Sequence, residues 1–280
     1  MKVAVIGAGG WGTALSIVLL AKGHDVRLWA YEADLAERLA RTRENDIFLQ
    51  GVLLPDGVRV TNDLGGSVAG AELILLVTPS HALRATAARL GAEAPGAFAA
   101  APLVVVATKG LETGSLRRMS EVAAETLPGG AGADAVVLAG PSHAEEVARQ
   151  VPTAIVAACR DHDRAEAVQE ACSTEWFRIY TNEDVVGVEI GVALKNVVAI
   201  AAGISDGLAF GDSTKAALLT RGLVEIRNLR CIARSCWRRA RGSSRGSSRS
   251  PCRRRRRAAT GSPRSVGRIA PSSRRPQHRC

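Results

Sequence analysis

The sequence predicts an α/β protein with a doubly wound, mainly parallel sheet, followed by an all-helical domain and a disordered basic tail. Three observations support this fold class. Short apolar segments alternate with amphipathic ones through the first 158 residues. Two helical segments follow residue 184 with no strand between them, and the periodic pattern is lost after about residue 226. Alternating strands and helices are typical of parallel sheets that carry helices on both faces.

The expected strands are short and strongly apolar, and Glu72–Val77 (ELILLV) and Leu103–Ala107 (LVVVA) are the clearest. The other strands are expected at Lys2–Ile6, Asp25–Trp29, Val58–Thr61, Ala135–Ala139 and Thr153–Ala158. Helices are expected between them at Gly12–Ala21, Ala33–Arg43, Leu64–Ala69, Ser80–Leu90 and Ser115–Thr126.

The two helices that follow have a different character. Val185–Ile204 is apolar on nearly every face, and Asp184 before it is a residue type that caps helices. The second helix is expected to begin at Asp212 or Ser213 and to run toward Ile226. We therefore expect a sheet domain over residues 1–180, the start of a helical domain over 181–226, and a tail over 227–280.

Charge divides the 280 residues in the same way. The net charge is +10, but residues 227–280 hold eighteen arginines and no Lys, Asp or Glu. Residues 1–226 hold 19 basic and 27 acidic residues, a net charge of −8. The tail has too few apolar residues to order itself. Arginine without lysine is typical of GC-rich DNA read out of frame, so we expect a disordered frameshift product rather than a nucleic-acid-binding arm.

Cysteine usage and apolar segments indicate the compartment. Only Cys159 and Cys172 lie in the first 226 residues, and no CxxC pair exists, so neither a metal site nor a disulfide framework is expected. Two scattered cysteines fit a reducing, cytoplasmic location. The uncharged segment Val3–Ala21 contains four glycines, which favour a strand–turn–helix over a membrane span.

The glycines Gly7, Gly9 and Gly12 form a GxGxxG between the first strand and the first helix. In that position the motif is typical of a Rossmann-type dinucleotide site, in which the backbone and the helix N-terminus hold the pyrophosphate. NAD or NADP is therefore the expected cofactor. Glu32, after the second strand, could accept a hydrogen bond from the ribose of NAD, and the choice between the two cofactors stays open.

Two further segments follow strand ends, where ligands bind in such sheets. Lys109 follows Leu103–Ala107 and could hold an anion or polarise a carbonyl. Gly140-Pro141-Ser142-His143-Ala144 leaves the next strand and begins a helix, which suggests a second backbone cradle.

Lys195 is the sharpest catalytic candidate. It lies in the apolar helix, and Gly187, Gly191 and Lys195 recur on one helix face. We expect a desolvated lysine with a lowered pKa that exchanges protons near neutrality. The alternative is an ion-paired lysine, with Glu189 or Asp206 as its partner.

Together these motifs resemble one family. GAGGWGTAL, VVATKGLE, LAGPSHAEEV, ALKNVVAIAAGISDGL and TKAALLTRGL, in this order, resemble NAD(P)-dependent glycerol-3-phosphate dehydrogenase of the bacterial type over residues 1 to about 226. The resemblance implies a Rossmann domain followed by a helical substrate domain. It also implies interconversion of glycerol 3-phosphate and dihydroxyacetone phosphate in the cytoplasm, feeding phospholipid synthesis.

The resemblance also implies roles for individual residues. Lys195 would be the catalytic proton acceptor. The substrate would contact Lys109, Gly140, Ser142, Lys195 and Asn196. The dinucleotide would contact Gly7, Gly9, Gly10, Trp11, Gly12, Tyr31, Lys109 and Ala144. A homodimer is an expectation, whereas a specific nucleic acid and a membrane are not expected partners.

The chain also departs from the family. Val192 stands where the family usually has glycine, and a Gly-Leu-Gly-Asp motif and a Ser-Arg-Asn triplet are missing after TRGL. We therefore expect a truncated helical domain and little activity from this chain. Two alternatives remain at this point. One is another Rossmann dehydrogenase with a helical second domain, of the 2-hydroxyacid or ketopantoate type. The other is an inactive dinucleotide-binding module with a basic nucleic-acid-binding arm.

Overall fold

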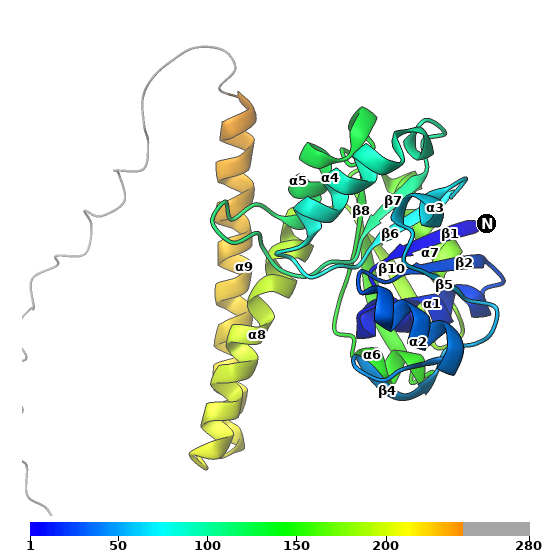
Figure 1. Cartoon of the computed structure of the whole chain (residues 1–280). Coiled ribbons are helices and arrows are strands. Elements are labelled where there is room, and N and C mark those ends of the chain that lie inside the picture. Colours follow the sequence, from blue (N-terminus) through cyan, green and yellow to red (C-terminus); the bar gives the residue numbers. More distant parts are fainter. Residues whose placement is uncertain (243–280) are drawn as a thin grey trace, which may run out of the picture. The chain divides into compact units, whose positions relative to one another are not determined.

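An eight-stranded sheet forms the centre of the structure, a computed structural model that describes the backbone of residues 1–242 and the side chains of residues 1–229 (Figure 1). The strand order is β10-β9-β8-β7-β6-β1-β2-β5. Neighbouring strands are parallel except at β8–β9, so β9 and β10 run opposite to the other six. The strands are β1 (Lys2–Ile6), β2 (Asp25–Trp29), β5 (Arg59–Thr61), β6 (Leu73–Leu76), β7 (Leu103–Val106), β8 (Val136–Ala139), β9 (Thr153–Ala158) and β10 (Phe177–Asn182).

Helices cover both faces of this sheet and bury its strands. Alternate side chains of β1 enter two separate cores: Val3 and Val5 face one, and Ala4 and Ile6 the other. The first core includes side chains from α1 (Gly10–Ala21), α2 (Ala33–Thr42), α6 (Ala144–Ala148) and α7 (His162–Cys172). The second includes side chains from α3 (Leu64–Val68), α4 (Leu83–Glu93) and α5 (Met119–Thr126). The predicted doubly wound, mainly parallel sheet is thus confirmed.

Some elements differ from the prediction. The strand β10, the helix α7 and a small hairpin of β3 (Glu44–Asn45) with β4 (Leu49–Leu53) were not expected. Short 3-10 turns occupy Pro95–Phe98 and Pro128–Gly130. Helix α4 begins at Leu83 rather than Ser80, because residues 79–82 form a turn closed by the Ala82 N–H on the Pro79 carbonyl. Helix α5 begins at Met119 rather than Ser115, since Arg118 and Glu121 form its capping box.

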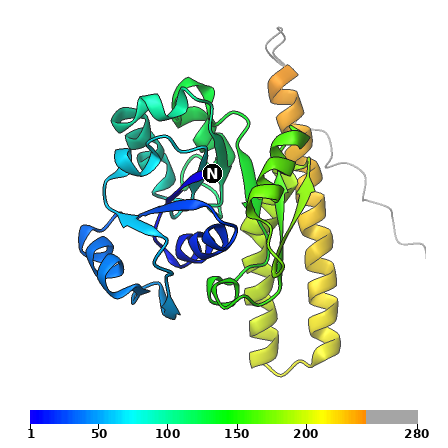
Figure 2. The same cartoon turned by 90° about the vertical axis from the view of Figure 1, so that its right-hand side faces the viewer.

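Two long helices follow the sheet. Helix α8 (Val185–Gly207) is capped as predicted by Asp184, whose carboxylate accepts from the Gly187 N–H at 3.1 Å. Helix α9 (Asp212–Gly242) turns back along it (Figure 2). Lys215 pairs with Asp206 at 2.7 Å near the turn, and Gly222 lies against the Val198 side chain.

The observed elements can be compared with the expected domain limits. The last strand of the sheet, β10, ends at Asn182, two residues beyond the expected limit of 180. Helix α9 continues to Gly242, well beyond Ile226, so residues 227–242 are helical rather than disordered. Arginine, the commonest residue type over this segment, is a good helix former, which explains why the helix continues here. The rest of the expected disordered tail, 243–280, lies outside the described residues.

Among residues 1–242, α8 alone is long and apolar enough to cross a membrane. Core helices of water-soluble proteins meet the same criterion. Val185 of α8 is part of the second core, and Val188 and Val192 pack against it. The length and composition of α8 are therefore weak support for a membrane span.

Candidate active site

The glycine loop follows β1 at the point where the strand order reverses between β1 and β6. A Cβ on Gly7 would lie 2.7 Å from the Val77 carbonyl oxygen, and Gly7 has φ +124°. A Cβ on Gly12 would lie 1.8 Å from the Gly7 carbonyl oxygen, and one on Gly10 would lie 2.5 Å from the Phe48 carbonyl oxygen. Gly9 differs, because a Cβ there would have no protein atom within 4 Å. Gly7, Gly10 and Gly12 therefore leave no room for a side chain, whereas the space beside Gly9 is open.

Helix α1 begins at this loop and presents donors at its start. No side chain caps its N-terminus, and the first N–H with a backbone acceptor is that of Thr13, on the Gly9 carbonyl. Within the described chain the N–H groups of Gly10, Trp11 and Gly12 have no acceptor. Free N–H groups at a helix start, beside an open glycine, fit the pyrophosphate of a dinucleotide.

Asn45, which the sequence did not single out, holds the loop in place. It is fully buried in the β3–β4 hairpin, and its amide donates to the Ala8 carbonyl and the Thr13 hydroxyl, both at 2.8 Å. Its side-chain oxygen accepts from the Phe48 N–H at 3.1 Å. The sequence signal is weak, since Asn45 lies in a polar segment, TRENDIF, without strand or helix periodicity.

Lys109 connects the glycine loop to the segment after β8. Its Nζ donates to the Ser142 hydroxyl at 3.1 Å and to the Ser142 carbonyl at 3.3 Å. The same ammonium lies 5.1 Å from the centre of the Trp11 ring, a cation–π distance. The structure thus brings together Trp11, Lys109 and Ser142, three predicted site residues from three different strand ends.

The electrostatics of this cluster favour an anion. Burial, followed by the positive charge of Lys195, lowers the pKa of Lys109 to about 8. Two like charges at one strand edge repel each other, and an anionic ligand between them relieves the repulsion. A small pocket lies beside Lys109, lined by Thr108, Lys109, Gly110, Val137, Ala139, Glu189 and Val192.

The environment of Lys195 corrects the expectation of a desolvated lysine. Lys195 is only partly buried, and the next two residues of α8, Asn196 and Val197, are exposed. Neither suggested ion-pair partner is available to Lys195, because Glu189 pairs with Arg118 and Asp206 with Lys215. Burial is the first cause of the lowered pKa of Lys109, whereas the residues that follow Lys195 on α8 are exposed.

Glu189 and Arg118 form a buried ion pair that joins α8 to the sheet domain. Each residue is 6% exposed, and the Arg118 guanidinium donates to the Glu189 carboxylate at 2.6 Å. The Ser120 N–H and hydroxyl donate to the same carboxylate at 2.9 and 2.7 Å. Glu121 also pairs with Arg118, at 3.0 Å. All charges in this cluster are satisfied, so it fixes the first turns of α8 on the sheet domain.

The other predicted site residues are placed as follows. Ala144, at the start of α6, lies 3.5 Å from the Cβ position of Gly10, so it borders the glycine loop. Gly140 is buried, and a Cβ there would lie 3.0 Å from Ile155. Tyr31 follows β2 and is 68% exposed, with its ring edge-on to Trp29. Asn196 is exposed and its side chain makes no hydrogen bond to another described residue, so the structure does not bring it into the cluster.

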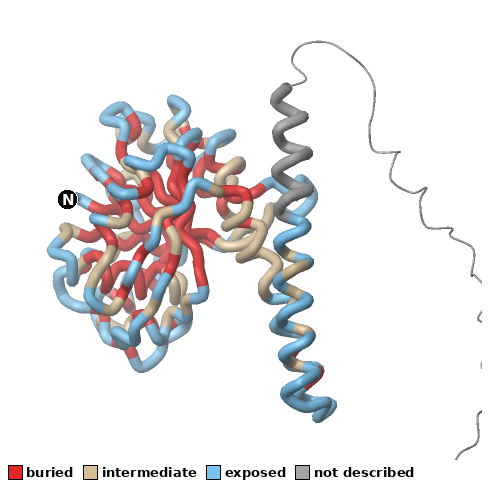
Figure 3. Tube along the Cα trace, turned by 180° about the vertical axis from the view of Figure 1, so that it is seen from behind, coloured by how far each residue is buried: buried red, intermediate tan, exposed pale blue. Residues whose placement is uncertain are grey.

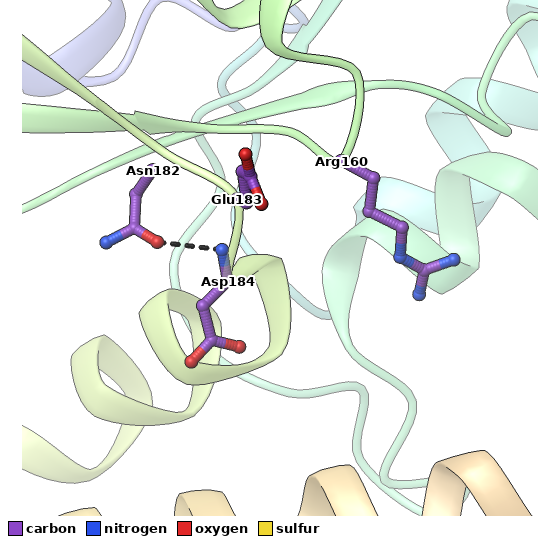
Figure 4. A pocket seen from close by; sticks show the side chains of 4 residues that line it. All are labelled: Arg160, Asn182, Glu183 and Asp184. Carbon is purple, nitrogen blue, oxygen red and sulfur yellow. Dashed lines mark hydrogen bonds between the residues drawn. The ribbon is translucent and has the colours of Figure 1, made fainter.

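A second pocket lies at the far end of the strands from the glycine loop, and Figure 4 shows the side chains that line it. It is lined by Arg160, Asn182, Glu183 and Asp184, at the carboxyl ends of β9 and β10 and the start of α8. Because β9 runs antiparallel to β8, these strand ends point away from the glycine loop. Asn182 Oδ1 accepts from the Asp184 N–H at 2.7 Å. The pocket marks the junction between the sheet and α8, not the dinucleotide site.

Comparison with known proteins agrees with this arrangement. A family model described as the NAD-dependent glycerol-3-phosphate dehydrogenase N-terminus matches residues 2–165, and the corresponding C-terminus model matches residues 184–236. The glycerol-3-phosphate dehydrogenases (NAD(P)+) of Chlorobium luteolum and Lysinibacillus sphaericus are each 48% identical to the chain. These alignments cover 82% and 81% of this chain, and 68% and 66% of the two relatives.

A solved structure gives the same result. Glycerol-3-phosphate dehydrogenase from Coxiella burnetii superposes with a TM-score of 0.74 and 38% identity, covering 82% of this chain and 68% of that one. The chain thus spans about two thirds of the length of these relatives. The other dehydrogenase classes considered from the sequence have no comparable support. The chain belongs to the family of NAD(P)-dependent glycerol-3-phosphate dehydrogenases, oxidoreductases that interconvert glycerol 3-phosphate and dihydroxyacetone phosphate.

Proposed function

We propose that residues 1–182 hold NAD or NADP at the glycine loop, and that Lys195 and Lys109 act on a three-carbon phosphate beside it. The observation that carries this proposal is the position of Lys109. Its ammonium donates to the Ser142 hydroxyl and lies at a cation–π distance from the Trp11 ring. The charge of Lys195 is the second cause that lowers its pKa. One side chain therefore links the cofactor loop, the substrate-side segment after β8 and helix α8.

The dinucleotide would be held by Gly7, Gly9, Gly10, Trp11, Gly12, Tyr31, Lys109 and Ala144. The open position at Gly9 and the free N–H groups after it support this assignment, because both leave room and donors for a pyrophosphate. When bound, the nicotinamide supplies hydride transfer to or from the substrate carbon.

The substrate would contact Lys109, Gly140, Ser142, Lys195 and Asn196. Lys195 would take the hydroxyl proton of glycerol 3-phosphate and return it to the alkoxide in the reverse direction. Lys109 and Ser142 would orient the oxygen atoms of the substrate, while the two ammonium groups offset its negative charge. The partial exposure of Lys195 and the position of Asn196 on the exposed part of α8 indicate that this half of the site is incomplete.

The incomplete half supports the proposal that this chain has little turnover. Family members carry a Ser-Arg-Asn triplet and a Gly-Leu-Gly-Asp motif after TRGL, and this sequence lacks both. Without them, water has access to Lys195 and the substrate phosphate loses a bidentate partner. We further propose that the reading frame changes near residues 226–229, and that restoring it would regenerate these motifs.

The same proposal places the protein in the cytoplasm, where its product would feed glycerophospholipid synthesis. The two buried free cysteines, Cys159 and Cys172, are consistent with a reducing compartment. A homodimer would cover part of the apolar surface of α8 and α9. Neither a nucleic acid nor a membrane is part of the proposed function.

The test compares dinucleotide binding with turnover. The chain should bind NADH or NADPH, and energy transfer from tryptophan to the nicotinamide measures this binding. It should show little oxidation of either dinucleotide when dihydroxyacetone phosphate is added. Gly9→Val should weaken binding by about 2 kcal/mol, because its side chain fills the open position. Failure of the folded chain to bind either dinucleotide would refute the cofactor site, and turnover at the level of a full-length relative would refute the incomplete site.

A further inference from the structure

We infer that this chain selects NAD over NADP, and that Glu32 at the start of α2 is the residue that makes the choice. The inference rests on the dinucleotide site proposed above, and it concerns the adenosine ribose, far from the lysines. NAD carries a 2′-hydroxyl on this ribose, and NADP carries a 2′-phosphate.

The backbone places Glu32 beside the glycine loop. Strands β1 and β2 are hydrogen-bonded neighbours, with Ile6 opposite Trp29. The Gly7 N–H donates to the Trp29 carbonyl at 3.1 Å, so the loop is tied to the end of β2. Glu32 follows three residues later, 20 residues after Gly12. In this fold an acidic residue at about that spacing accepts a hydrogen bond from the ribose 2′-hydroxyl.

The Glu32 carboxylate is available for that bond. Glu32 is the N-cap residue of α2, but its side chain makes no capping hydrogen bond. It is exposed, and no described side chain or backbone group donates to its carboxylate. Asn62, on the neighbouring loop, already uses its amide on the carbonyls of Ala30 and Tyr31, both at 2.8 Å. These bonds fix the backbone just before Glu32 and leave its carboxylate without a protein partner.

The charges around Glu32 disfavour a 2′-phosphate, which carries close to two negative charges at neutral pH. Asp34 lies in the first turn of α2, and Asp63 caps α3 after the neighbouring strand β5. Arg38, the first basic residue of α2, is held by Asp34 at 2.7 Å and by Asp46 at 3.3 Å. Among the described residues, a phosphate here would meet carboxylates and no unpaired basic side chain.

The remaining described arginines near β2 are also paired or distant. Arg27 donates to the carbonyls of Gly66 and Ala69, Arg59 pairs with Asp25, and Arg89 pairs with Glu93. Arg41 lies nine residues beyond Glu32, about 13 Å farther along the helix. The neutral 2′-hydroxyl of NAD therefore fits the acidic surroundings of Glu32 better than a 2′-phosphate does.

The experiment titrates the full chain and its variants with NADH and with NADPH, following energy transfer from tryptophan. We expect NADH to bind at least about tenfold more tightly, since a hydrogen bond to a charged group is lost and repulsion is added for NADPH. Glu32→Gln should remove most of the preference, and Glu32→Arg should reverse it. Glu37 is exposed on the same helix and its side chain makes no hydrogen bond among the described residues, so Glu37→Gln and Glu37→Arg are charge-matched controls.

Each outcome decides the matter. A preference for NADH that falls in the Glu32 variants and persists in the Glu37 variants would support the inference. Equal or tighter binding of NADPH, or equal effects of the Glu37 variants, would overturn it while leaving the dinucleotide site intact. Binding of neither dinucleotide would overturn the proposed site itself, and with it this inference.

Discussion

The sheet domain and the helical pair α8–α9 bury their apolar side chains to very different degrees (Figure 3). Nearly every large apolar side chain of the inner strands is buried between two layers of helices. By contrast, Val197, Ile200 and Ile204 of α8 and its C-cap Leu208 form one stripe, with exposures of 63, 65, 59 and 57%. An exposed stripe of this size is typical of a surface that packs on further protein.

The change from buried to exposed side chains occurs within α8, close to Lys195. Val185, Val186 and Glu189 are buried on the sheet domain, whereas Asn196 and Val197 are exposed. Lys195 lies eleven residues after the cap Asp184, about 16 Å along the helix axis. The first half of α8 thus belongs structurally to the sheet domain. The position of Lys195 therefore depends on how firmly the first half of α8 is attached to the sheet domain.

The largest effect is expected from cutting the buried connection between the two regions. Glu189→Ala leaves the Arg118 guanidinium buried with only Glu121 as a charged partner. We expect a loss of about 3 kcal/mol in the free energy of unfolding, the lower end for a broken buried pair. Urea denaturation followed by tryptophan fluorescence measures it.

A surface pair serves as the control for that experiment. Arg38→Ala removes the ion pairs with Asp34 and Asp46, both on the surface, and should cost less than about 1 kcal/mol. Equal losses from Glu189→Ala and Arg38→Ala would show that the buried pair does not attach α8.

A smaller effect is expected within the sheet domain, at the glycine loop. Gly12→Ala places a Cβ against the Gly7 carbonyl oxygen and should destabilise the protein by about 1–3 kcal/mol. Gly9→Ala meets no protein atom within 4 Å, so its unfolding free energy should stay within about 0.5 kcal/mol of the original. Thermal unfolding of both variants, with and without dinucleotide, separates the folding role of Gly12 from the proposed binding role of Gly9. A stable Gly12→Ala protein would contradict the close contact.

The sequence predicted the sheet domain well for a physical reason. Buried parallel strands such as LVVVA and ELILLV are apolar throughout, and the glycine motif is defined by local backbone geometry. Lys109 and Ser142 were both predicted as site residues because they follow strand ends, and the structure brings them into contact. The missed strand β10 is a half-buried edge strand with alternating exposure, and α7 presents mainly small residues to the core, so both signals are weak.

The environment of Lys195 was predicted less well. The apolar composition of α8 suggests a buried helix, but burial depends on tertiary partners that composition does not specify. Glu189 looked like a neighbour of Lys195 in sequence, yet its partner Arg118 is 71 residues away. Long-range pairing of this kind has no local signal, and neither does the anchoring of the glycine loop by Asn45.

The exposed stripe of α8 should tolerate polar side chains. Ile200→Gln or Ile204→Gln should change the free energy of unfolding by no more than about 0.5 kcal/mol, because neither side chain is buried. Val192→Ala, in the half of α8 that packs on the sheet domain, should cost more. Urea denaturation compares the three variants, and sedimentation velocity shows whether the stripe mediates self-association. A larger loss at Ile200 than at Val192 would contradict the comparison of the two halves.

The smallest expected effect concerns the titration of one group, and it tests whether the two regions meet at the site. Burial is the main cause that lowers the pKa of Lys109 to about 8, and the Lys195 charge is the second. Lys195→Ala should therefore raise the pKa of Lys109 without restoring its ordinary value of 10.5. Nuclear magnetic resonance of lysine side chains labelled at Cε measures this pKa directly, with Lys109→Met to assign the signal.

The same change has a consequence for stability whose sign follows from the direction of the shift. The unfolded chain holds the Lys109 proton more tightly than the folded chain, so stability should rise with pH between about 8 and 10.5. In Lys195→Ala the rise should begin at higher pH and be smaller, and in Lys109→Met it should be absent. If the pKa of Lys109 were the same with and without Lys195, helix α8 would not bring its lysine to the strand edge, and the proposed pairing of the two lysines around one anion would fail.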